Sequence, residues 1–416
     1  VIVCDEWHEL VGSKRAVLVE LALSRLKTLL PTLRIWGISA TIGNLAEAAL
    51  LLLGRDAEKT GYQLIKAHLP KKYAIQTIFP DTIERFSWSG HLGVHLADKL
   101  LPIIQQSQST LIFTNTRRQC EIWYQQLLET DPMLAGQLAM HHGSLSREIR
   151  DWVEESLHTG YLKAVVCTSS LDLGVDFRPV QTVIQIGSPK GVARFMQRAG
   201  RAGHQPGAIS TIYFLPTHSL EIIEGAALRQ AVTHQRLEAR QPYLHCIDVL
   251  VQYLVTLAVS DGFQPDQLLE EIRTTYAYTD LTDEDWQWCL DFISKGGKCL
   301  YAYDEYKKVE PQENGIWLVT NAFIAKKHRL SIGAIVSDAV LQIEYMGGKF
   351  LGAIEEGFVA QLKRGDVFWY AGKSLEFVRI HNMTVQVRKS AATKGKIPTW
   401  AGGRMPMSSE LAVEIR

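Results

Sequence analysis

The sequence has no apolar run approaching the roughly 20 consecutive residues that a membrane span requires. Its start, Val1-Ile2-Val3-Cys4-Asp5, carries neither a basic stretch nor a cleavage signal, and it lacks an initiator Met. These absences predict a soluble, intracellular protein with no membrane association. The missing Met also leads us to expect further sequence before Val1.

Cysteine pairs and net charge are missing as well. The six cysteines are widely spaced without a CxxC pair, which argues against a zinc ribbon and against a disulfide framework. The 44 basic side chains equal the 44 acidic ones, so the net charge gives no simple argument for a polyanionic partner. What remains is an ordinary globular composition, 46% hydrophobic over 416 residues, which favours two to four domains of roughly 100–200 residues each.

Residues 1–72 follow a strand, helix, strand, helix pattern. A β-branched run delivers Asp5 and Glu6 to a strand end, where an open parallel sheet places ligand-binding groups. Helices are expected at Ala16–Leu30 and Leu45–Leu53, with a strand at Arg34–Ser39 between them. This region therefore reads as part of an α/β domain.

Residues 73–217 alternate strands and helices over a longer stretch, which predicts a complete parallel sheet. The strands are expected at Ile75–Phe79, Thr110–Phe113, Ala164–Cys167, Thr182–Ile186 and Ser210–Phe214. The helices between them include Gln119–Glu129 and Arg147–Leu157.

The remaining chain divides into a helical and a β region. Residues 218–325 predict helices at Leu220–Arg240, Ile247–Val259, Pro265–Ala277 and Asp283–Lys295. Residues 326–416 predict a small β domain, with short strands at Lys349–Ile354, Val367–Tyr370, Glu376–Ile380 and Thr384–Val387. The neutral total conceals a contrast, because the helical region holds 8 basic and 17 acidic residues whereas the β region holds 14 and 8.

Several motifs follow the expected strands. In an NTPase sheet, the pair in Asp5-Glu6-Trp7-His8 would divide the work, with Asp5 holding Mg²⁺ and Glu6 activating water. An acidic cap on the next helix explains the tetrapeptide equally well. Ser39-Ala40-Thr41 follows the next strand, where two hydroxyls could bond to Asp5 or His8, although such a tripeptide is also a common turn.

The most specific element is Gln197–His204, in which small residues allow close helix packing while Arg201 projects as an arginine finger towards a transferring phosphoryl group. Two further segments, Leu111–Arg117 and Cys167–Phe177, place hydroxyl residues at the ends of neighbouring strands. Solvated helix charges and capped loops are the plainer explanations for these segments.

Taken in order, these segments and His141–Arg147 resemble motifs II to VI of superfamily 2 DExH helicases. Trp7, His204 and the segments Leu330–Val336 and Thr399–Ala412 resemble the Lhr (large helicase-related) family, most of all the bacterial ligase-associated DNA damage response DExH helicases. The resemblance covers essentially the whole chain. It implies a multidomain α/β protein with the C-terminal part of one RecA-like domain (1–72), a second RecA-like parallel sheet (73–217), a helical winged-helix domain (218–325) and a basic, barrel-like β domain (326–416).

The resemblance also assigns roles residue by residue. It implies that Asp5 and Glu6 serve Mg²⁺ and water, and that His8 with Ser39 and Thr41 couples ATP hydrolysis to movement. The second RecA-like domain would bring Gln197, Arg201, Gly174, Asp176 and His204 to the nucleotide or the interdomain cleft. A second arginine finger is in doubt because His204 stands where many relatives have Arg, and Arg198 receives no role. The phosphates of a loaded strand would lie on Thr114, Arg117, Ser144 and Thr168.

One helicase motif is missing from the sequence. No GxxxxGK[ST] loop occurs, and Gly347-Gly348-Lys349 lacks both its spacing and its hydroxyl residue. We therefore expect no ATP hydrolysis by this chain alone, and a phosphate-binding loop within about 150 residues upstream in the parent protein, on the usual domain length.

In the β region, a basic run leads up to Trp400, which favours backbone attraction followed by base stacking over a core role for this indole. Trp317 and Trp369 lie in apolar runs and are expected in cores, whereas Arg229, Arg236 and Arg240 fit solvated helix charges better than a strand contact.

The resemblance implies an ATP- and Mg²⁺-dependent DNA helicase of a bacterial cytoplasm, acting in repair, and the 3′-to-5′ direction rests on the resemblance alone. The expected partner is single-stranded DNA, a tailed duplex or an RNA–DNA hybrid. The family also implies a functional link to a DNA ligase and a nuclease, and we expect a monomer. The alternatives are a Ski2-like RNA helicase and, for this chain alone, a non-catalytic nucleic-acid-binding module.

Overall fold

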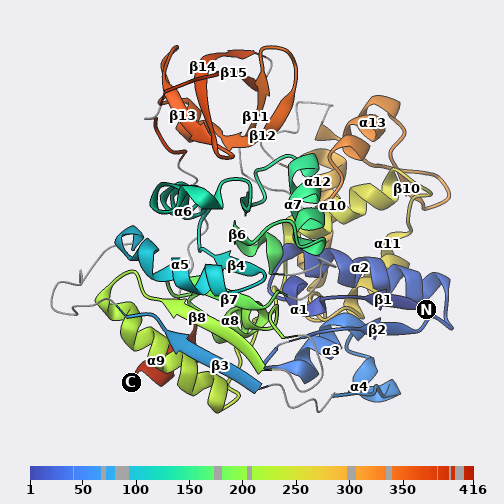
Figure 1. Ribbon diagram of the computed structural model, residues 1–416. Helices are drawn as coiled ribbons and strands as arrows, with labels where there is room; N and C mark the ends of the chain where they lie inside the picture. The colour runs from blue at the N-terminus through green and yellow to red at the C-terminus, as the bar shows by residue number, and fades with distance from the viewer. Residues whose placement is uncertain are drawn as a thin grey trace. The chain divides into compact units, whose positions relative to one another are not determined.

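A computed structural model describes residues 1–40, 42–66, 72–79, 93–172, 180–203, 209–297, 306–333, 340–381, 383–392, 395–398 and 407–416. The chain forms two compact units (Figure 1). The first unit contains residues 1–67 and 239–337, and the second contains residues 68–238 and 338–416. Each unit therefore combines two separate stretches of the chain, and the boundaries of the four predicted domains stay a prediction.

The first unit opens with two short parallel strands, β1 (Ile2–Cys4) and β2 (Ile35–Gly37). The helices here are α1 (Trp7–Leu10), α2 (Lys14–Leu29), α3 (Leu45–Leu53) and α4 (Ala57–Thr60). The helices predicted at Ala16–Leu30 and Leu45–Leu53 are confirmed. Gly54 ends α3 with a positive φ of 79°, a backbone conformation that favours glycine.

The rest of the first unit is mainly helical, as predicted. It contains α10 (Ile247–Ala258), α11 (Pro265–Arg273), α12 (Asp283–Lys295), α13 (Ala322–Leu330) and a short hairpin of β9 (Glu310–Pro311) with β10 (Trp317–Leu318). Leu21 of α2 packs with Leu250, Leu254 and Ile272 in one buried cluster, which joins the two parts of the unit. Trp317 is partly buried against this cluster, in agreement with its predicted core role.

The second unit is built on six parallel strands. These are β3 (Lys72–Thr77), β4 (Thr110–Phe113), β5 (Leu138–His141), β6 (Ala164–Cys167), β7 (Thr182–Ile186) and β8 (Ile209–Leu215), in the order β3-β8-β7-β4-β6-β5. All five predicted strands are confirmed. The sixth, β5, escaped prediction because Leu138-Ala139-Met140-His141 contains no β-branched residue, and strand propensity is strongest for such residues.

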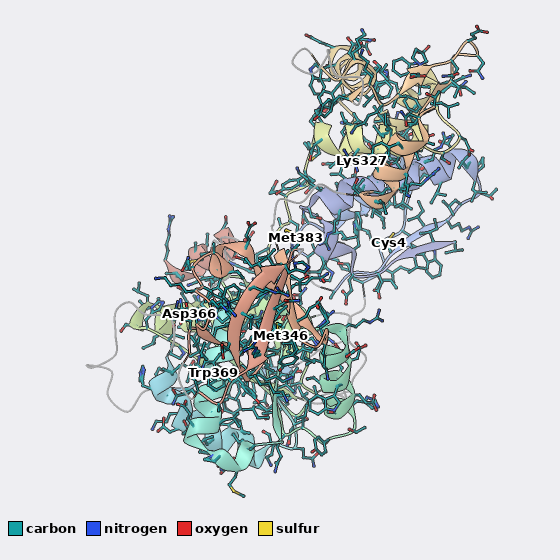
Figure 2. The ribbon with its side chains drawn as sticks, turned by 90° about the horizontal axis from the view of Figure 1, so that it is seen from above. Cys4, Lys327, Met346, Asp366, Trp369 and Met383 are labelled. Carbon is teal, nitrogen blue, oxygen red and sulfur yellow. The ribbon has the colours of Figure 1, made fainter. Side chains whose placement is uncertain are left out.

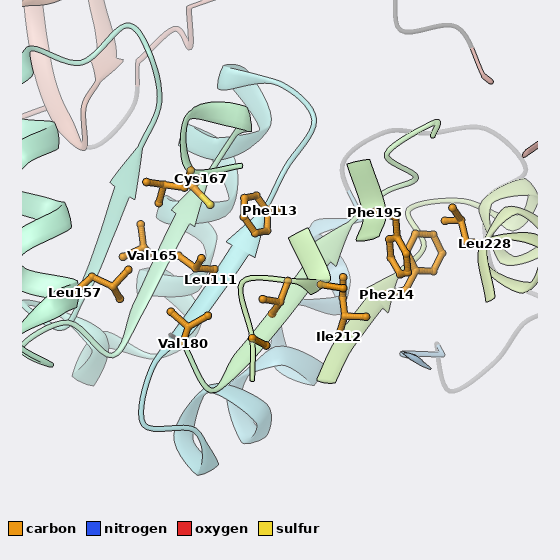
Figure 3. Close-up of a cluster of buried hydrophobic side chains, with 14 of the residues drawn as sticks. Leu111, Phe113, Leu157, Val165, Cys167, Val180, Phe195, Ile212, Phe214 and Leu228 are labelled. Atoms are coloured by element: carbon orange, nitrogen blue, oxygen red, sulfur yellow. The ribbon is translucent and has the colours of Figure 1, made fainter. Parts of the chain in front are cut away.

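Helices cover both faces of this sheet (Figure 1). They are α5 (Ala97–Gln106), α6 (Arg117–Thr130), α7 (Arg147–His158), α8 (Val192–Ala199), α9 (Ser219–Thr233) and the C-terminal α15 (Ser409–Ile415). Leu111 and Phe113 of β4 point into one buried cluster, which Figure 3 shows with Phe195 and Leu228, whereas Ile112 points into the other. This alternation buries both faces, as expected for a parallel sheet.

The predicted helix Leu220–Arg240 is shorter in the structure, where α9 ends at Thr233. The chain turns at Gln235, whose φ of 54° is left-handed and cannot continue a helix. The residues after this turn therefore run free of α9, and Glu238 caps another helix, α8.

A second sheet follows in the same unit. It consists of β11 (Val340–Tyr345), β12 (Phe350–Glu355), β13 (Val367–Tyr370), β14 (Lys373–His381) and β15 (Thr384–Lys389), in the order β12-β11-β15-β14-β13, with the short helix α14 (Glu356–Val359). The sheet curls into a half-barrel (Figure 1), which confirms the predicted barrel-like fold. Figure 2 shows Met346, Asp366 and Trp369 on this C-terminal sheet.

The basic run Lys326–Arg329 does not belong to this sheet, contrary to expectation. It lies on α13 of the first unit, where Figure 2 labels Lys327. Asn321 caps this helix by accepting the N–H groups of Phe323 (2.9 Å) and Ile324 (3.3 Å). His328 is buried, with its Nε2 atom 2.9 Å from the hydroxyl of Thr256 on α10. A capped amphipathic helix thus explains the run.

Candidate nucleotide and nucleic-acid site

The carboxyl ends of the parallel strands bring three predicted motif segments together in the second unit. The N–H group of Thr114, after β4, donates to the carbonyl of Cys167 at 2.8 Å. The N–H group of Thr168, after β6, donates to the carbonyl of His141 at 3.2 Å. The structure therefore places the segments beginning at Leu111, His141 and Cys167 side by side at one edge, where α/β proteins bind ligands.

The hydroxyl groups in these segments point inward. Thr114 is fully buried and donates its hydroxyl to the carbonyl of Cys167 (3.1 Å). Ser144 is 3% exposed, and its carbonyl accepts the Ala353 N–H group (2.9 Å) and the Tyr370 hydroxyl from the C-terminal sheet. The Thr114 hydroxyl and the Ser144 carbonyl thus bond to neighbouring groups of the protein, and the predicted phosphate contacts of both residues stay a prediction.

Arg117 is a different case, because its side chain is partly exposed at the start of α6. Thr116 caps this helix by accepting the Gln119 N–H group at 3.1 Å. A guanidinium beside a helix N-terminus adds positive charge where N–H groups already favour an anion. Of the predicted strand contacts described by the structure, Arg117 is therefore the best placed for a phosphate. Thr168 is 7% exposed.

A buried ion pair joins two of the motif segments. The guanidinium of Arg198 donates to both carboxylate oxygens of Asp172, at 2.8 and 3.2 Å, and to Oε1 of Gln185 at 2.7 Å. It also stands 4.8 Å from the centre of the Phe113 ring. Arg198, which the sequence left without a role, locks α8 onto the strand ends. Asp172 and Gln185 were not predicted, although Asp172 stands within the predicted Cys167–Phe177 segment.

Arg201, the predicted arginine finger, lies just beyond this ion pair. Its guanidinium donates to the carbonyl oxygen of Asp172 at 3.1 Å from Nε and 2.6 Å from Nη2. Asp172 thus holds Arg198 through its side chain and Arg201 through its backbone. A flexible arginine side chain loses conformational entropy when it binds a ligand. Because the Arg201 guanidinium is already held in place, less of that entropy would remain to be lost on binding an anion.

The start of α8 is also fixed. Glu238 accepts the N–H groups of Val192 and Ala193, the latter at 2.7 Å, and places a carboxylate at the positive end of the helix. Gln197 lies on this helix with a partly exposed side chain. The helix that carries the predicted residues is therefore held by Glu238 at one end and by Asp172 at the other.

In the first unit, Asp5 and Glu6 follow β1 as predicted. The Glu6 N–H group donates to Oδ1 of Asp5 at 2.9 Å, and Glu6 takes a left-handed φ of 48° that is uncommon for a residue other than glycine. Asp5 is exposed, whereas Glu6 is partly exposed. Strain of this kind at a carboxylate pair is typical of functional sites.

His8 links this pair to the next predicted segment. Its ring is fully buried, and Nδ1 accepts the Ala40 N–H group at 3.4 Å. Burial lowers the pKa of His8, against the opposing effect of Glu9 and Glu6, so the ring is neutral at physiological pH. His8 therefore contacts the backbone of Ala40, and the predicted role of His8, Ser39 and Thr41 in coupling stays a prediction. The Ser39 hydroxyl is buried without a hydrogen-bond partner among the described residues.

Asp5 of the first unit is suited to binding Mg²⁺ together with water and substrate phosphates. The described residues contain no group of three or more His, Cys, Asp or Glu side chains able to hold a metal ion. Mg²⁺ is usually bound through one or two carboxylates together with substrate phosphates and water, and the exposed Asp5 suits that mode.

The only GK[ST] tripeptide in the sequence, Gly372-Lys373-Ser374, offers no phosphate loop. It connects the antiparallel strands β13 and β14, whereas a phosphate loop connects a strand to a helix. The predicted site residues Thr41, Gly174, Asp176, His204 and Trp400 lie outside the described residues. Within the described ranges, no helix is both long and apolar enough to span a membrane.

Two family models match the chain. Residues 94–205 match the helicase conserved C-terminal domain, and residues 230–397 match the winged helix domain of large helicase-related protein. The second match covers most of the predicted helical region and most of the predicted β region.

Relatives extend over the whole chain. It is 31% identical over 431 residues to "ATP-dependent helicase Lhr-Core protein 2" of Thermococcus barophilus, and 26% identical over 467 residues to "Lhr helicase/uracil glycosylase" of Escherichia coli. All of this chain is covered in both, but only 48% of the first relative and 30% of the second. The chain thus spans about half the length of the archaeal relative.

Solved structures agree with these relatives. Mycobacterium smegmatis helicase Lhr, bound to ssDNA and AMP-PNP, matches 89% of this chain and 48% of its own length, with a TM-score of 0.72 and 26% identity. The DUF1998 helicase MrfA, bound to DNA, covers 94% of this chain at a TM-score of 0.66, but its 18% identity supports the fold alone.

Proposed function

This chain belongs to the Lhr family of helicases, and from that premise we propose that its parent protein is an ATP-dependent DNA helicase that moves along a single strand. The observation that carries the proposal is the arrangement around Asp172. Its carboxylate holds Arg198 and its carbonyl holds Arg201, at the strand edge where Thr114 and Thr168 also lie.

In this proposal the first unit supplies the hydrolytic carboxylates. Asp5 would hold Mg²⁺, which neutralises phosphate charge when bound, and Glu6 would orient and deprotonate the attacking water. Neutral His8 would accept the Ala40 N–H group and so connect this pair to the backbone after β2. Thr41, outside the described residues, keeps its predicted part in this coupling.

The second unit would contribute nucleotide contacts of its own. Arg201 would stabilise the charge on the transferring phosphoryl group, and Gln197 would contact the nucleotide from α8. Gly174, Asp176 and His204 keep their predicted nucleotide contacts. Arg117 would hold a phosphate of the strand, and Trp400 would stack on a base.

The finer parts of the proposal concern direction and substrate. We propose 3′-to-5′ movement, a role in DNA repair, activity on tailed duplexes or RNA–DNA hybrids, and a functional link to a ligase and a nuclease. DNA is preferred over RNA as the tracked strand because the matched Mycobacterium smegmatis helicase is described as bound to ssDNA. A Ski2-like activity would appear instead as stimulation by RNA.

The test is ATP hydrolysis by the full-length parent protein, with single-stranded DNA and RNA of the same sequence as activators. Glu6→Gln should lower the DNA-stimulated rate by about 10²–10⁴, the range for a lost general base. Arg201→Ala should lower it by about 10³ or more. Glu58→Gln, at an exposed position of α4, is the matched control and should leave the rate unchanged. Full activity in the first two variants would refute the proposal.

A further inference from the structure

A surface pocket of about 160 Å³ lies in the second unit, between α7 and the C-terminal sheet. Its walls come from α7 on one side and from the starts of β12 and β14 on the other, and they include Glu148, Ile149, Trp152, Lys349, Phe350 and Lys373. The pocket has room for one planar ring system and is smaller than the roughly 300–1,000 Å³ typical of drug-sized ligand sites.

Two aromatic side chains of the pocket are exposed. Trp152 is 53% exposed and Phe350 is 42% exposed. The helix α7 attaches to the protein through other residues, because Val153 and Leu157 are buried in the sheet's core while Trp152 is not. Packing of α7 therefore does not explain this indole, and a flat apolar surface in a polar rim is typical of a binding site.

The charge around the pocket is positive. Burial lowers the pKa of Lys373, and the like charges of Lys349 and Lys389 lower it further. Among the described residues, none of these three ammonium groups has a carboxylate within ion-pair distance. Glu148 is the one acidic residue of the pocket wall. Clustered lysines repel one another, so an anion between them would gain attraction that the protein itself does not provide.

The walls are held rigidly against each other. The Ser146 N–H group donates to the Leu351 carbonyl at 3.1 Å, and the Ala353 N–H group donates to the Ser144 carbonyl at 2.9 Å. Between them, Gly352 has a φ of 154°, and a Cβ atom there would collide with the Ser144 carbonyl. The pocket is therefore formed in advance, which reduces the entropic cost of binding.

We propose that this pocket binds one unstacked base of a single-stranded nucleic acid, with the neighbouring phosphates on Lys349, Lys373 and Lys389. Trp152 and Phe350 supply the stacking surface, which accepts any base because every base has an aromatic face. The inference rests on the proposed helicase function and adds to it a strand contact on the outer side of α7. It is independent of Trp400 and of the residues around Asp172.

The first experiment measures binding of fluorescent oligothymidylate to the full-length parent protein over a range of salt concentrations. Trp152→Ala should weaken binding about 5- to 100-fold at every salt concentration, as expected for one lost stacking contact, with an unchanged salt slope. The double variant Lys349→Gln/Lys373→Gln should instead reduce the slope by about 1.4, since each phosphate contact on a single strand contributes about 0.7.

The control is Trp288→Ala, because Trp288 on α12 is also 53% exposed but lies in the other unit. It should leave both affinity and slope unchanged. Equal affinities for wild type, Trp152→Ala and Trp288→Ala would overturn the inference. DNA-stimulated ATP hydrolysis measured on the same samples separates the two proposals, because its presence in wild type supports the helicase function whatever Trp152 does.

The second experiment locates the strand directly and does not depend on variant folding. Oligonucleotides that carry 5-iodouracil, which photocrosslinks to stacked aromatic side chains, are bound to the wild-type full-length protein and the crosslinked peptides are identified. A crosslink to Trp152 or Phe350 is expected. Crosslinks that all fall elsewhere would overturn the inference, and a protein partner of this surface would then be the next hypothesis.

Discussion

Strands and helices alternate in residues 1–67 of the first unit and in residues 68–238 of the second, but the two regions bury their strands differently. In the second unit, every residue of β4, β5, β6 and β7 is buried. In the first unit, Val3 of β1 is 50% exposed and Trp36 of β2 is 61% exposed. The comparison shows that a strand's apolar sequence does not itself bury it. Neighbouring strands and helices on both faces do so in the second unit, whereas among the described residues β1 and β2 pair only with each other.

The units also differ in the charges that they bury. The second unit buries a paired charge, Arg198 with Asp172, at exposures of 2% and 6% for the side chains. The first unit buries Glu20 at 3% exposure, where Oε2 accepts the Ala277 N–H group at 2.9 Å and burial raises the pKa of Glu20 to about 8. The buried Asp172 thus has a cationic partner, whereas burial of Glu20 favours its protonated form.

Breaking the buried pair should have the largest effect on stability. Arg198→Ala leaves the Asp172 carboxylate buried without its cation, which costs about 3–5 kcal/mol. Arg240→Ala in the first unit removes a partly exposed pair with Glu9 and should cost about 0–1 kcal/mol. Urea unfolding of the full-length protein, followed by hydrogen exchange in α8 and α1, measures both. Equal losses would contradict the contrast between the units.

A double replacement sharpens this prediction. Arg198→Met with Asp172→Leu removes both charges, and apolar replacements of a buried pair are often neutral or stabilising. The double variant should therefore recover most of the stability lost in Arg198→Ala. The Arg201 contact should return as well, because it is made to the backbone carbonyl of residue 172, which the double variant keeps.

Glu20 should give the first unit a stability that falls as pH rises. Its pKa is about 8 in the folded protein and 4.5 for the ordinary group, so the folded state holds the extra proton between these values. The contribution is fully present below pH 4.5 and is lost as pH rises through about 8. Glu20→Gln, which keeps the shape of the neutral acid, should flatten this dependence. Hydrogen exchange of the Ala277 amide between pH 5 and 9 measures it.

His141 should give the second unit the opposite pH dependence, with a smaller effect. Burial, and then Arg150 and His142, lower the pKa of His141 to about 4 from 6.5. Between these values the unfolded state binds the proton and the folded state does not, so stability is lost as pH falls from 6.5 to 4. His141→Gln should remove that slope. Hydrogen exchange in β5 that is unchanged down to pH 4 in wild type would contradict the prediction.

Much of the second unit could be predicted because its strands carry unambiguous signals. Runs such as Thr110–Phe113 and Thr182–Ile186 are short, apolar and bounded by turn residues, and the structure reproduces their bounds. The strand Leu138–His141 was not predicted, because its residues are not strong strand formers. It becomes a strand through its pairing with β6. The assignment of Lys326–Arg329 to the β domain was wrong. These residues come just before the short apolar runs that predicted the β domain, and their sequence did not separate them from it.

The candidate site was predictable in its segments but not in its contacts. Strand-end motifs must share one edge of a parallel sheet, so Thr114 and Thr168 could be placed together from sequence. Contacts between residues that are far apart in the sequence cannot be predicted in this way. Nothing in the sequence indicates that Arg198 pairs with Asp172 or that the C-terminal sheet covers Ser144, because these contacts depend on how α8 and β12 pack.

Two matched helix caps provide the smallest test of the comparison between the units. Thr116 on α6 and Thr282 on α12 are both exposed, and each accepts an N–H group three residues later at 3.1 Å. The first turn of α12 also carries three acidic residues that favour the helix dipole, whereas α6 begins with Arg117 and Arg118, which oppose it.

Loss of the cap should therefore lower the free energy of unfolding more in the second unit than in the first. Thr116→Ala should cost about 1–2 kcal/mol and Thr282→Ala about 0.5–1 kcal/mol, within the range known for such caps. Thr116→Ser and Thr282→Ser keep the accepting oxygen and serve as controls with little change. Urea midpoints report the difference, which high salt should narrow because the dipole's interaction with charged residues is screened. A larger loss for Thr282→Ala than for Thr116→Ala would mean that the acidic first turn does not compensate for the missing cap.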